Sequence, residues 1–469
     1  MSPDNQNNQM KKLLVAVFFF ISAISYAQKS PEPFKDGDKV IFAGNSITEA
    51  GFYEMYIWQY YILHFPNRKI TVYNGGLGGD VAGNILARLD GDILAKKPTV
   101  VVITFGMNDS RYFEYFNTPE EKVRKEAVAT SLGSYLGIEK KLKALPNVRK
   151  IIMTSSPYDE TVTGPKNNFI GKYKTMQAIA AFQQKSAIKN QWAFVNLMDQ
   201  MTAIDLREQN KDTNFTLTGP DRIHPGNAGH FAMAWLFLKA QGLSNTVVAD
   251  VNINAGTGKL VKGLNCFITN IKSTQGKLSF DYHAKSLPFP IDTVPRVWEN
   301  PQKQSDALAV IPFTEEFNKE MLAVTGLKGN SNYELSIDGE RIGEWRGSEL
   351  GKGINLATFS NTPQYRQAQQ VADLNLQYRE LEGKLRSYYW LQFNYFMKKG
   401  MLFQDTEAAL DSVNNAASKD WAVASKKDNY QQARKKEVRD NWQQEMQAMK
   451  EKMYVVNQPV KHTIIITSK

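Results

Sequence analysis

Apolar residues in the first half of the chain gather in short runs rich in valine and isoleucine. These runs lack the polar alternation of a half-exposed strand, and helix-length amphipathic stretches separate them. Such a pattern predicts strands buried on both faces, and therefore a parallel sheet with helices on each side. The predicted strands are residues 39–43, 69–73, 99–105, 149–155 and 192–196.

From about residue 251 the pattern changes, and turns containing glycine or asparagine separate short strand-like runs. Asp338-Gly339 is a favoured two-residue hairpin turn, and it lies between the runs 333–337 and 341–345. This texture predicts a small antiparallel β domain. Its predicted strands are residues 277–282, 307–311, 320–325 and 332–337, followed by the run 341–345 after the turn.

A third texture begins after Thr362-Pro363, where apolar residues recur at alternating spacings of three and four. This spacing predicts one apolar seam on a long helix. The seam consists of Val371, Leu374, Tyr378, Leu381, Leu385, Tyr388 and Tyr395. A second helix is predicted over about 418–453, and residues 462–467 are strand-like again. We therefore expect a long helical hairpin inserted into the β domain, packed on another part of the chain or on a second copy.

Composition and charge add little to this organisation. The 469 residues are 42% hydrophobic and 22% charged, as in ordinary globular proteins, and the length suggests two or three domains. The formal net charge is +10, but the lysines and arginines are interleaved with acidic residues, and no zinc or RNA-binding signature is present. A solvated basic surface is therefore expected, without a nucleic-acid partner.

The N-terminus has the pattern of a signal peptide. Lys11 and Lys12 precede an apolar run over 13–24, and Ser25 and Ala27 are small residues suited to cleavage after position 27. The run is shorter than the roughly 20 residues that cross a bilayer, so no stable membrane anchor is expected. The pattern predicts export to the periplasm or the extracellular space. Cys266, the single cysteine, is expected to be a buried apolar thiol.

Four short segments carry candidate chemistry. Ser46, in Gly-Asn-Ser-Ile, follows a predicted strand directly, which places its hydroxyl where open α/β sheets bind ligands; a helix-capping serine is the alternative. The glycine-rich segment 74–80 matches no phosphate-loop spacing. Asn108, in Gly-Met-Asn-Asp, is an oxyanion donor or a turn residue. Asp221 lies three residues before His224, close enough to orient the ring as a base.

The remaining histidines have no such carboxylate partner. His64 and His230 lie in predicted helical segments, and His283 and His462 lie in the C-terminal β region. His224 is therefore the histidine with the features of a general base.

The order Gly-Asn-Ser-Ile, Asn-x-Gly-x-x-Gly, Gly-x-Asn-Asp and Asp-x-x-His-Pro resembles the four blocks of the SGNH hydrolases, also called GDSL esterases and lipases. The resemblance spans residues 39 to about 240 and implies a three-layer α/β/α sandwich with a parallel sheet. It also implies that Ser46 is the nucleophile, His224 the base and Asp221 its orienting acid. The Ser46 and Gly79 N–H groups and the Asn108 amide would form the oxyanion hole.

Two positions depart from the family pattern. Asn45 replaces a common aspartate, which is not the catalytic acid of the family. Arg222 replaces a frequent glycine and could contact an anionic or hydroxylated substrate. The expected organisation is a signal peptide (1–27), a hydrolase domain (36–246), a β domain (251–361 and 455–469) and a helical hairpin (362–454).

The resemblance implies an exported serine esterase that uses an acyl-enzyme, no cofactor and no metal. We expect it to act on O-acetyl groups of carbohydrates, as small molecules or polysaccharides. A lipase, lysophospholipase or thioesterase is the first alternative. A glycan-binding or scaffold protein with a vestigial hydrolase domain is the second. A homo-oligomer formed through the helical hairpin is a further expectation.

Overall fold

Five parallel strands form the central sheet of the N-terminal half, in the order β2-β1-β3-β4-β5. The computed structural model describes residues 28–164 and 168–469, so the signal peptide predicted for 1–27 lies outside the described residues. All five predicted strands are present. Their bounds are Lys39–Gly44 (β1), Thr71–Gly76 (β2), Val100–Phe105 (β3), Arg149–Thr154 (β4) and Ala193–Val195 (β5).

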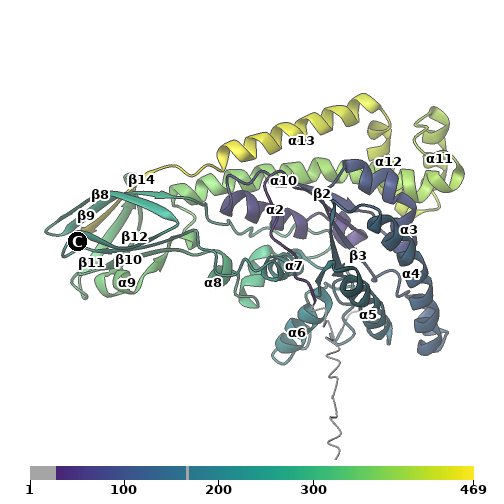
Figure 1. Ribbon diagram of the computed structural model, residues 1–469, viewed down its shortest axis with the longest axis horizontal. Helices are drawn as coiled ribbons and strands as arrows, with labels where there is room; N and C mark the ends of the chain where they lie inside the picture. The colour runs from purple at the N-terminus through teal and green to yellow at the C-terminus, as the bar shows by residue number, and fades with distance from the viewer. Residues whose placement is uncertain (1–27, 165–167) are drawn as a thin grey trace, which may run out of the picture.

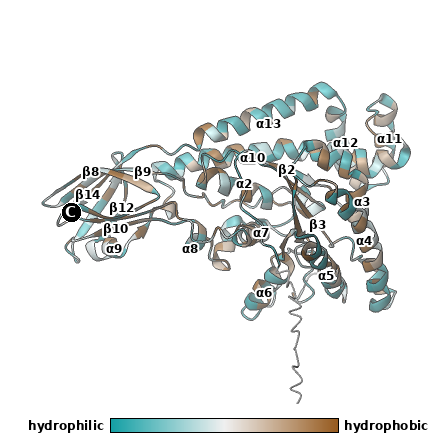
Figure 2. Ribbon diagram, in the orientation of Figure 1, coloured by the Kyte–Doolittle hydropathy of each residue, from teal (hydrophilic) through white to brown (hydrophobic). Residues whose placement is uncertain are grey.

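Successive residues of these strands point to opposite faces, and each face is covered by helices (Figure 1). Val40 and Phe42 of β1 join one core, whereas Ile41 and Ala43 join the other. The first core contains α2 (Tyr53–His64), α6 (Leu197–Gln209) and α7 (Asn227–Ala240). The second contains α3 (Ala82–Arg88), α4 (Glu120–Lys143) and α5 (Lys172–Asn190). Because both of its faces are buried, the central strand β3 is apolar at nearly every position, as Figure 2 shows. The predicted α/β/α sandwich is confirmed.

A separate β domain lies at one end of the molecule (Figure 1). Its larger sheet is antiparallel, with the order β12-β11-β14-β9-β8, and its smaller sheet has the order β13-β10-β6-β7. The strands are Ala249–Asn254 (β6), Lys259–Leu264 (β7), Cys266–Thr274 (β8), Lys277–Ala284 (β9), Glu320–Thr325 (β10), Asn332–Ile337 (β11), Glu340–Arg346 (β12), Ile354–Asn355 (β13) and His462–Ser468 (β14).

Two details of this domain bear on the sequence predictions. Asp338 and Gly339 both have positive φ, 52° and 84°, as the predicted hairpin turn requires. Strand β14 pairs with β9 and β11, so the chain returns to this domain at its end, as predicted. In the smaller sheet, however, β6 and β10 pair in parallel, so the domain is not antiparallel throughout.

The strand predicted at residues 307–311 is wrong. Residues Gln304–Ala309 form a 3-10 helix (η4), followed by the short helix α8 (Phe313–Phe317). The Asp306 carboxylate accepts a hydrogen bond from the Lys303 N–H at 2.8 Å, and Ala307 is fully buried in the sandwich core. A short apolar run cannot distinguish a buried strand from a buried helical turn, so the pattern was ambiguous here.

The helical region contains the predicted antiparallel pair and two further helices. Helix α10 (Pro363–Trp390) and helix α13 (Lys436–Val456) run side by side (Figure 1). The predicted second helix is broken, because Lys435 is extended and Asp420 caps a separate helix, α12 (Trp421–Ala433). Helix α11 (Glu407–Ala417) precedes it. The hairpin is therefore two long helices joined by a small helical tip.

The hairpin packs directly on the sandwich. Its seam residues, including Val371 and Tyr378, belong to the same continuous core as α2 and α7. The rings of Tyr378 and Trp58 meet edge to face with centroids 4.9 Å apart. The Tyr454 hydroxyl of α13 donates to the Ile70 carbonyl at 2.8 Å. Helices α10 and α13 therefore form an additional layer over α2.

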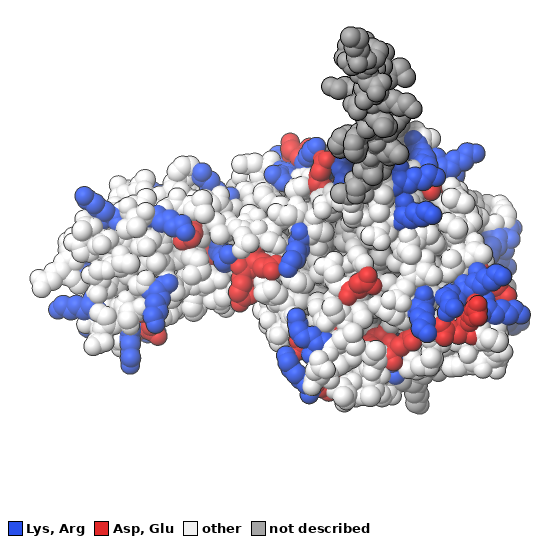
Figure 3. Space-filling model, turned by 60° about the horizontal axis from the view of Figure 1, so that its bottom comes forward, with Lys and Arg blue, Asp and Glu red and all other residues white. Residues whose placement is uncertain are grey.

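The two signs of charge are mixed on the face of the molecule in Figure 3. The lysines and arginines on that face do not gather in one stretch. Within residues 28–164 and 168–469, no helix is both long enough and apolar enough to cross a bilayer.

Candidate active site

Ser46 lies at the junction between strand β1 and the short helix α1 (Ser46–Glu49). Asn45 caps this helix, because its side-chain oxygen accepts a hydrogen bond from the Ile47 N–H at 3.0 Å. The capping role that Ser46 itself could have filled thus belongs to Asn45. The Ser46 hydroxyl is left at the carboxyl edge of the sheet, as the sequence predicts.

The loop before α7 carries the residues that meet this hydroxyl. His224 Nε2 lies 2.8 Å from Ser46 Oγ, and His224 Nδ1 lies 2.5 Å from Asp221 Oδ2. The other carboxylate oxygen, Asp221 Oδ1, accepts the backbone N–H groups of Ile223 and His224 at 2.9 Å each. The structure therefore brings the three predicted residues into one hydrogen-bonded chain, in the order that a serine hydrolase uses.

The electrostatics of Asp221 suit the orienting role. Burial opposes ionisation, but the hydrogen bonds from the His224 ring and from the two backbone N–H groups outweigh it and lower the pKa of the carboxyl below its usual range. Asp221 is therefore ionised at neutral pH. A carboxylate at Nδ1 fixes the tautomer that leaves Nε2 free to accept a proton.

The three predicted oxyanion donors border the same point of the sheet. Gly79 has φ of +82°, a conformation that favours glycine, in the loop after β2. Neither the Ser46 nor the Gly79 N–H donates to a protein acceptor among the residues that the structure describes. Asn108, in the loop after β3, donates one Nδ2 hydrogen to the Asp80 carbonyl at 3.0 Å, which leaves the other hydrogen available.

The Asn108 amide is held in a defined orientation. The Tyr112 hydroxyl donates to Asn108 Oδ1 at 2.6 Å. Asp109 accepts the Gly106 and Ala82 N–H groups at 3.0 Å, which ties this loop to the start of α3. These contacts fix which end of the amide presents its N–H, as a preorganised oxyanion donor requires.

Two buried arginines contact the carboxyl ends of strands β1 and β2, next to Ser46 and to the glycine-rich segment 74–80. Arg88 pairs with Asp80 at 2.7 Å and Asp92 at 2.6 Å, and its Nη2 donates to the Gly44 and Gly75 carbonyls. Arg386 of α10 also pairs with Asp92, at 2.7 Å, and donates to the Gly76 carbonyl at 3.1 Å. Burial opposes ionisation of Asp92, but the two guanidinium groups outweigh it and lower its pKa to about 2. The carboxylate therefore remains charged within this network.

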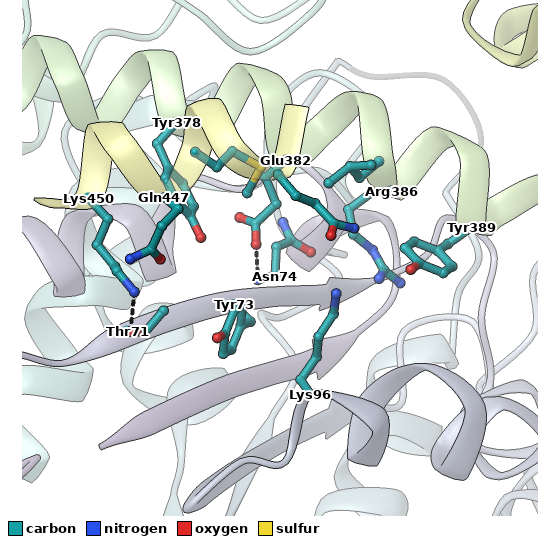
Figure 4. A pocket seen from close by; sticks show the side chains of 13 residues that line it. Thr71, Tyr73, Asn74, Lys96, Tyr378, Glu382, Arg386, Tyr389, Gln447 and Lys450 are labelled. Carbon is teal, nitrogen blue, oxygen red and sulfur yellow. Dashed lines mark hydrogen bonds between the residues drawn. The ribbon is translucent and has the colours of Figure 1, made fainter. Parts of the chain in front are cut away.

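Helix α10 also contacts the glycine-rich segment 74–80 through side chains that lie beside its apolar seam. Glu382 accepts the Asn74 N–H at 2.9 Å, and Trp390 Nε1 donates to the Gly78 carbonyl at 2.8 Å. Figure 4 shows Glu382 and Arg386 pointing from α10 toward β2. Sequence reasoning missed this support. The available signal was the spacing of Arg379, Glu382 and Arg386, which places three charges on one face next to the seam.

Stability should depend on pH through Glu382, because burial raises the pKa of its carboxyl to about 7 from 4.5. Between these values the folded protein binds the additional proton, so its free energy of unfolding falls as pH rises from 5 to 8. The Glu382→Gln variant keeps an oxygen for the Asn74 N–H but does not titrate. We expect its Tm to fall less over this range than that of the wild type.

The control for this measurement is Glu380→Gln, which changes an exposed carboxylate on the same helix. It should behave as the wild type does. Calorimetry at pH 5 and pH 8 measures the Tm of the three proteins. Equal falls in Tm would show that Glu382 does not titrate in this range.

A pocket of about 460 Å³ opens beside His224, whose ring meets Ser46 Oγ. Its walls are largely apolar and come from parts of the chain that lie far apart in sequence. They include Ile47, Phe52, Pro220, Trp298 and Trp421, together with Asp221 and His224. The site thus has room for a substrate portion next to the reacting hydroxyl.

Several other predicted residues take no part in the chain of hydrogen bonds from Ser46 to Asp221, although His230 borders the pocket. Arg222 does not line the pocket; its side chain is 3% exposed and donates to the Asp159 carbonyl at 2.9 Å, so the suggested substrate contact is wrong. His64 and His230 are buried, and burial lowers the pKa of each to about 3. Cys266 is only half-buried, on β8. Within the described residues, no group of metal-ligating side chains is found.

Two family profiles match the chain. The profile of the GDSL-like lipase/acylhydrolase family matches residues 42–232, which include all four sequence blocks. The profile of the diltiazem deacetylase C-terminal helical domain matches residues 369–458, which include most of α10 and all of α11, α12 and α13.

Individual relatives extend these matches. A solved structure described as a gut microbial diltiazem-metabolizing enzyme is 43% identical, covers 94% of this chain and 100% of its own, and has a TM-score of 0.91. The acetylxylan esterase of Geobacillus stearothermophilus is 26% identical over 224 residues, which are 44% of this chain and 94% of that protein. The chain therefore belongs to the GDSL-like lipase/acylhydrolase family, the SGNH hydrolases, and is an esterase that cleaves ester bonds.

Proposed function

We propose that this esterase is an exported acetylesterase that removes O-acetyl groups from carbohydrates through an acyl-enzyme on Ser46. The observation that carries the proposal is the hydrogen-bonded chain from Ser46 Oγ through the His224 ring to Asp221. The names of the relatives support the acetyl group, because one is an acetylxylan esterase and a matching profile is that of a diltiazem deacetylase domain. Export rests on the N-terminal pattern of residues 1–27.

In the proposed reaction, His224 Nε2 takes the Ser46 proton as Ser46 Oγ attacks the ester carbonyl carbon. The resulting oxyanion accepts hydrogen bonds from the Ser46 and Gly79 N–H groups and the Asn108 amide. His224 then returns the proton to the alcohol oxygen, which leaves. Water attacks the acyl-enzyme by the same path, with His224 as base, and releases acetate and free Ser46.

The acyl preference tests the proposal. We expect turnover of p-nitrophenyl esters to fall from acetyl to butyryl to octanoyl, and acetate to be released from acetylated xylan. A rate that climbs steadily toward octanoyl would favour the lipase alternative. Binding of acetylated xylan without any acetate release would favour a glycan-binding protein.

Export has a direct test. When the full chain is produced in a bacterial host, the exported protein should begin at Gln28 on N-terminal sequencing, because cleavage is expected after Ala27. Protein that stays in the cytoplasm with residues 1–27 intact would contradict the export proposal and leave the catalytic one unaffected.

A further inference from the structure

Two exposed tryptophans meet at the pocket beside Ser46. Trp298 and Trp421 are each 73% exposed, and their ring centroids lie 6.4 Å apart with an angle of 32° between the planes. Single exposed apolar side chains are common on protein surfaces, but two large ones in contact beside a reactive centre form an apolar surface that a ligand can cover. Both residues line the pocket that contains His224.

The backbone under each indole is anchored. Trp421 is the first residue of α12, and the Asp420 side chain caps that helix by accepting the Ala422 N–H at 2.9 Å. Trp298 follows residues whose N–H groups, those of Arg296 and Val297, donate to the Asn227 side-chain oxygen at 2.7 and 3.2 Å. Asn227 is the first residue of α7, just after the His224 loop. The backbone that carries the two indoles is therefore held in place relative to the loop of His224.

We propose that Trp298 and Trp421 form an indole wall that binds the ring of the alcohol portion of the ester. The assignment to the alcohol rests on the proposed function, because an acetyl group is too small to cover two indoles. The shared chemistry is a flat apolar ring face, which either a pyranose or an aromatic alcohol presents to an indole. The substrates are therefore acetates of ring-bearing alcohols.

A buried amide lies next to the wall. Asn300 lines the same pocket and is 7% exposed. Its Nδ2 has no acceptor among the residues that the structure describes, although a buried amide normally has one. Because this nitrogen is itself covered by protein atoms, the proposed contact with the alcohol portion rests on the two indoles alone.

The test compares acetates with and without a ring. Ethyl acetate has none, phenyl acetate has an aromatic ring, and a monoacetylated methyl xylopyranoside has a sugar ring. For the double variant Trp298→Ala/Trp421→Ala, we expect kcat/KM on at least one ring substrate to fall about tenfold or more, mainly through KM. On ethyl acetate it should stay within about twofold. The double Trp→Phe variant should recover most of the loss, since phenylalanine keeps an aromatic face.

The matched control is Phe267→Ala, which removes an aromatic side chain that is 58% exposed on β8, in the β domain. It should leave all three substrates unaffected. Loss confined to the xylopyranoside assigns the wall to sugars, and loss confined to phenyl acetate assigns it to aromatic alcohols. Equal loss on ethyl acetate, or no loss on either ring substrate, overturns the proposal.

Calorimetry separates this inference from the proposed function. Titration of the protein with phenol and with methyl xylopyranoside measures ring binding without hydrolysis, and the binding should be absent from the double alanine variant. If the wild type hydrolyses no acetate, the proposed function fails. Calorimetry alone then tests whether the indole wall binds a ring. If it hydrolyses all three substrates and the variants match it, only the wall is wrong.

Discussion

Replacing Ser46 with alanine is expected to lower kcat for acetyl-ester hydrolysis by about 10⁶-fold. The residue that remains has no oxygen to attack the carbonyl, although the oxyanion donors and the base stay in place. The fold should be unaffected, because the Ser46 hydroxyl contacts His224 and is not buried in a core. Release of p-nitrophenol from the acetyl ester measures the rate, and a thermal melt checks the fold.

Ser425→Ala is the matched control, since it removes an exposed hydroxyl from α12. It should retain the activity of the wild type. If the Ser46→Ala variant also turned over the acetyl ester at the wild-type rate, another residue would have to be the nucleophile.

The two partners of Ser46 should differ in their effects. His224→Ala removes the base and should lower kcat by about 10⁶-fold, whereas Asp221→Asn should cost about 10⁴-fold. The asparagine can still accept the Ile223 and His224 N–H groups through one oxygen. Its amide, however, would face His224 Nδ1 with a donor and favour the wrong ring tautomer. Rates measured for both variants from pH 6 to 9 test this order.

Asp373→Asn, an exposed carboxylate on α10, provides the control for the change of charge. An Asp221→Asn variant that matches the wild type across this pH range would remove Asp221 from the catalytic group. A His224→Ala variant that is more active than Asp221→Asn would reverse the assigned roles.

The sandwich was predictable because its signals are local. Strand β3 is apolar at nearly every position, since both of its faces are buried, and this alone identifies a central strand. Ser46 directly follows strand β1, and parallel strands bring their carboxyl ends to one edge. The structure indeed places Ser46, His224 and Asp221 within hydrogen-bonding distance. Their catalytic roles remain predictions.

The contacts between helix α10 and the loops around Ser46 could not be predicted from local sequence signals. Arg386 meets Asp92, and Trp390 meets the Gly78 carbonyl, across a sequence separation of about three hundred residues. Helical periodicity shows which face of α10 is apolar, but it does not name the surface that the face covers. Trp298 and Trp421 come together for the same reason, since only the tertiary fold places the start of α12 beside the loop before η4.

The position of β14 has a consequence for how the protein folds during synthesis. This strand lies in the middle of the larger sheet, between β9 and β11, yet it leaves the ribosome after the whole of α10 to α13. Until then β9 and β11 each present an unpaired edge, and pairing across so long a separation is slow. The sandwich and the helices can form first. Closure of the larger sheet then joins both ends of the helical region to the β domain, and we expect this closure to come last in folding.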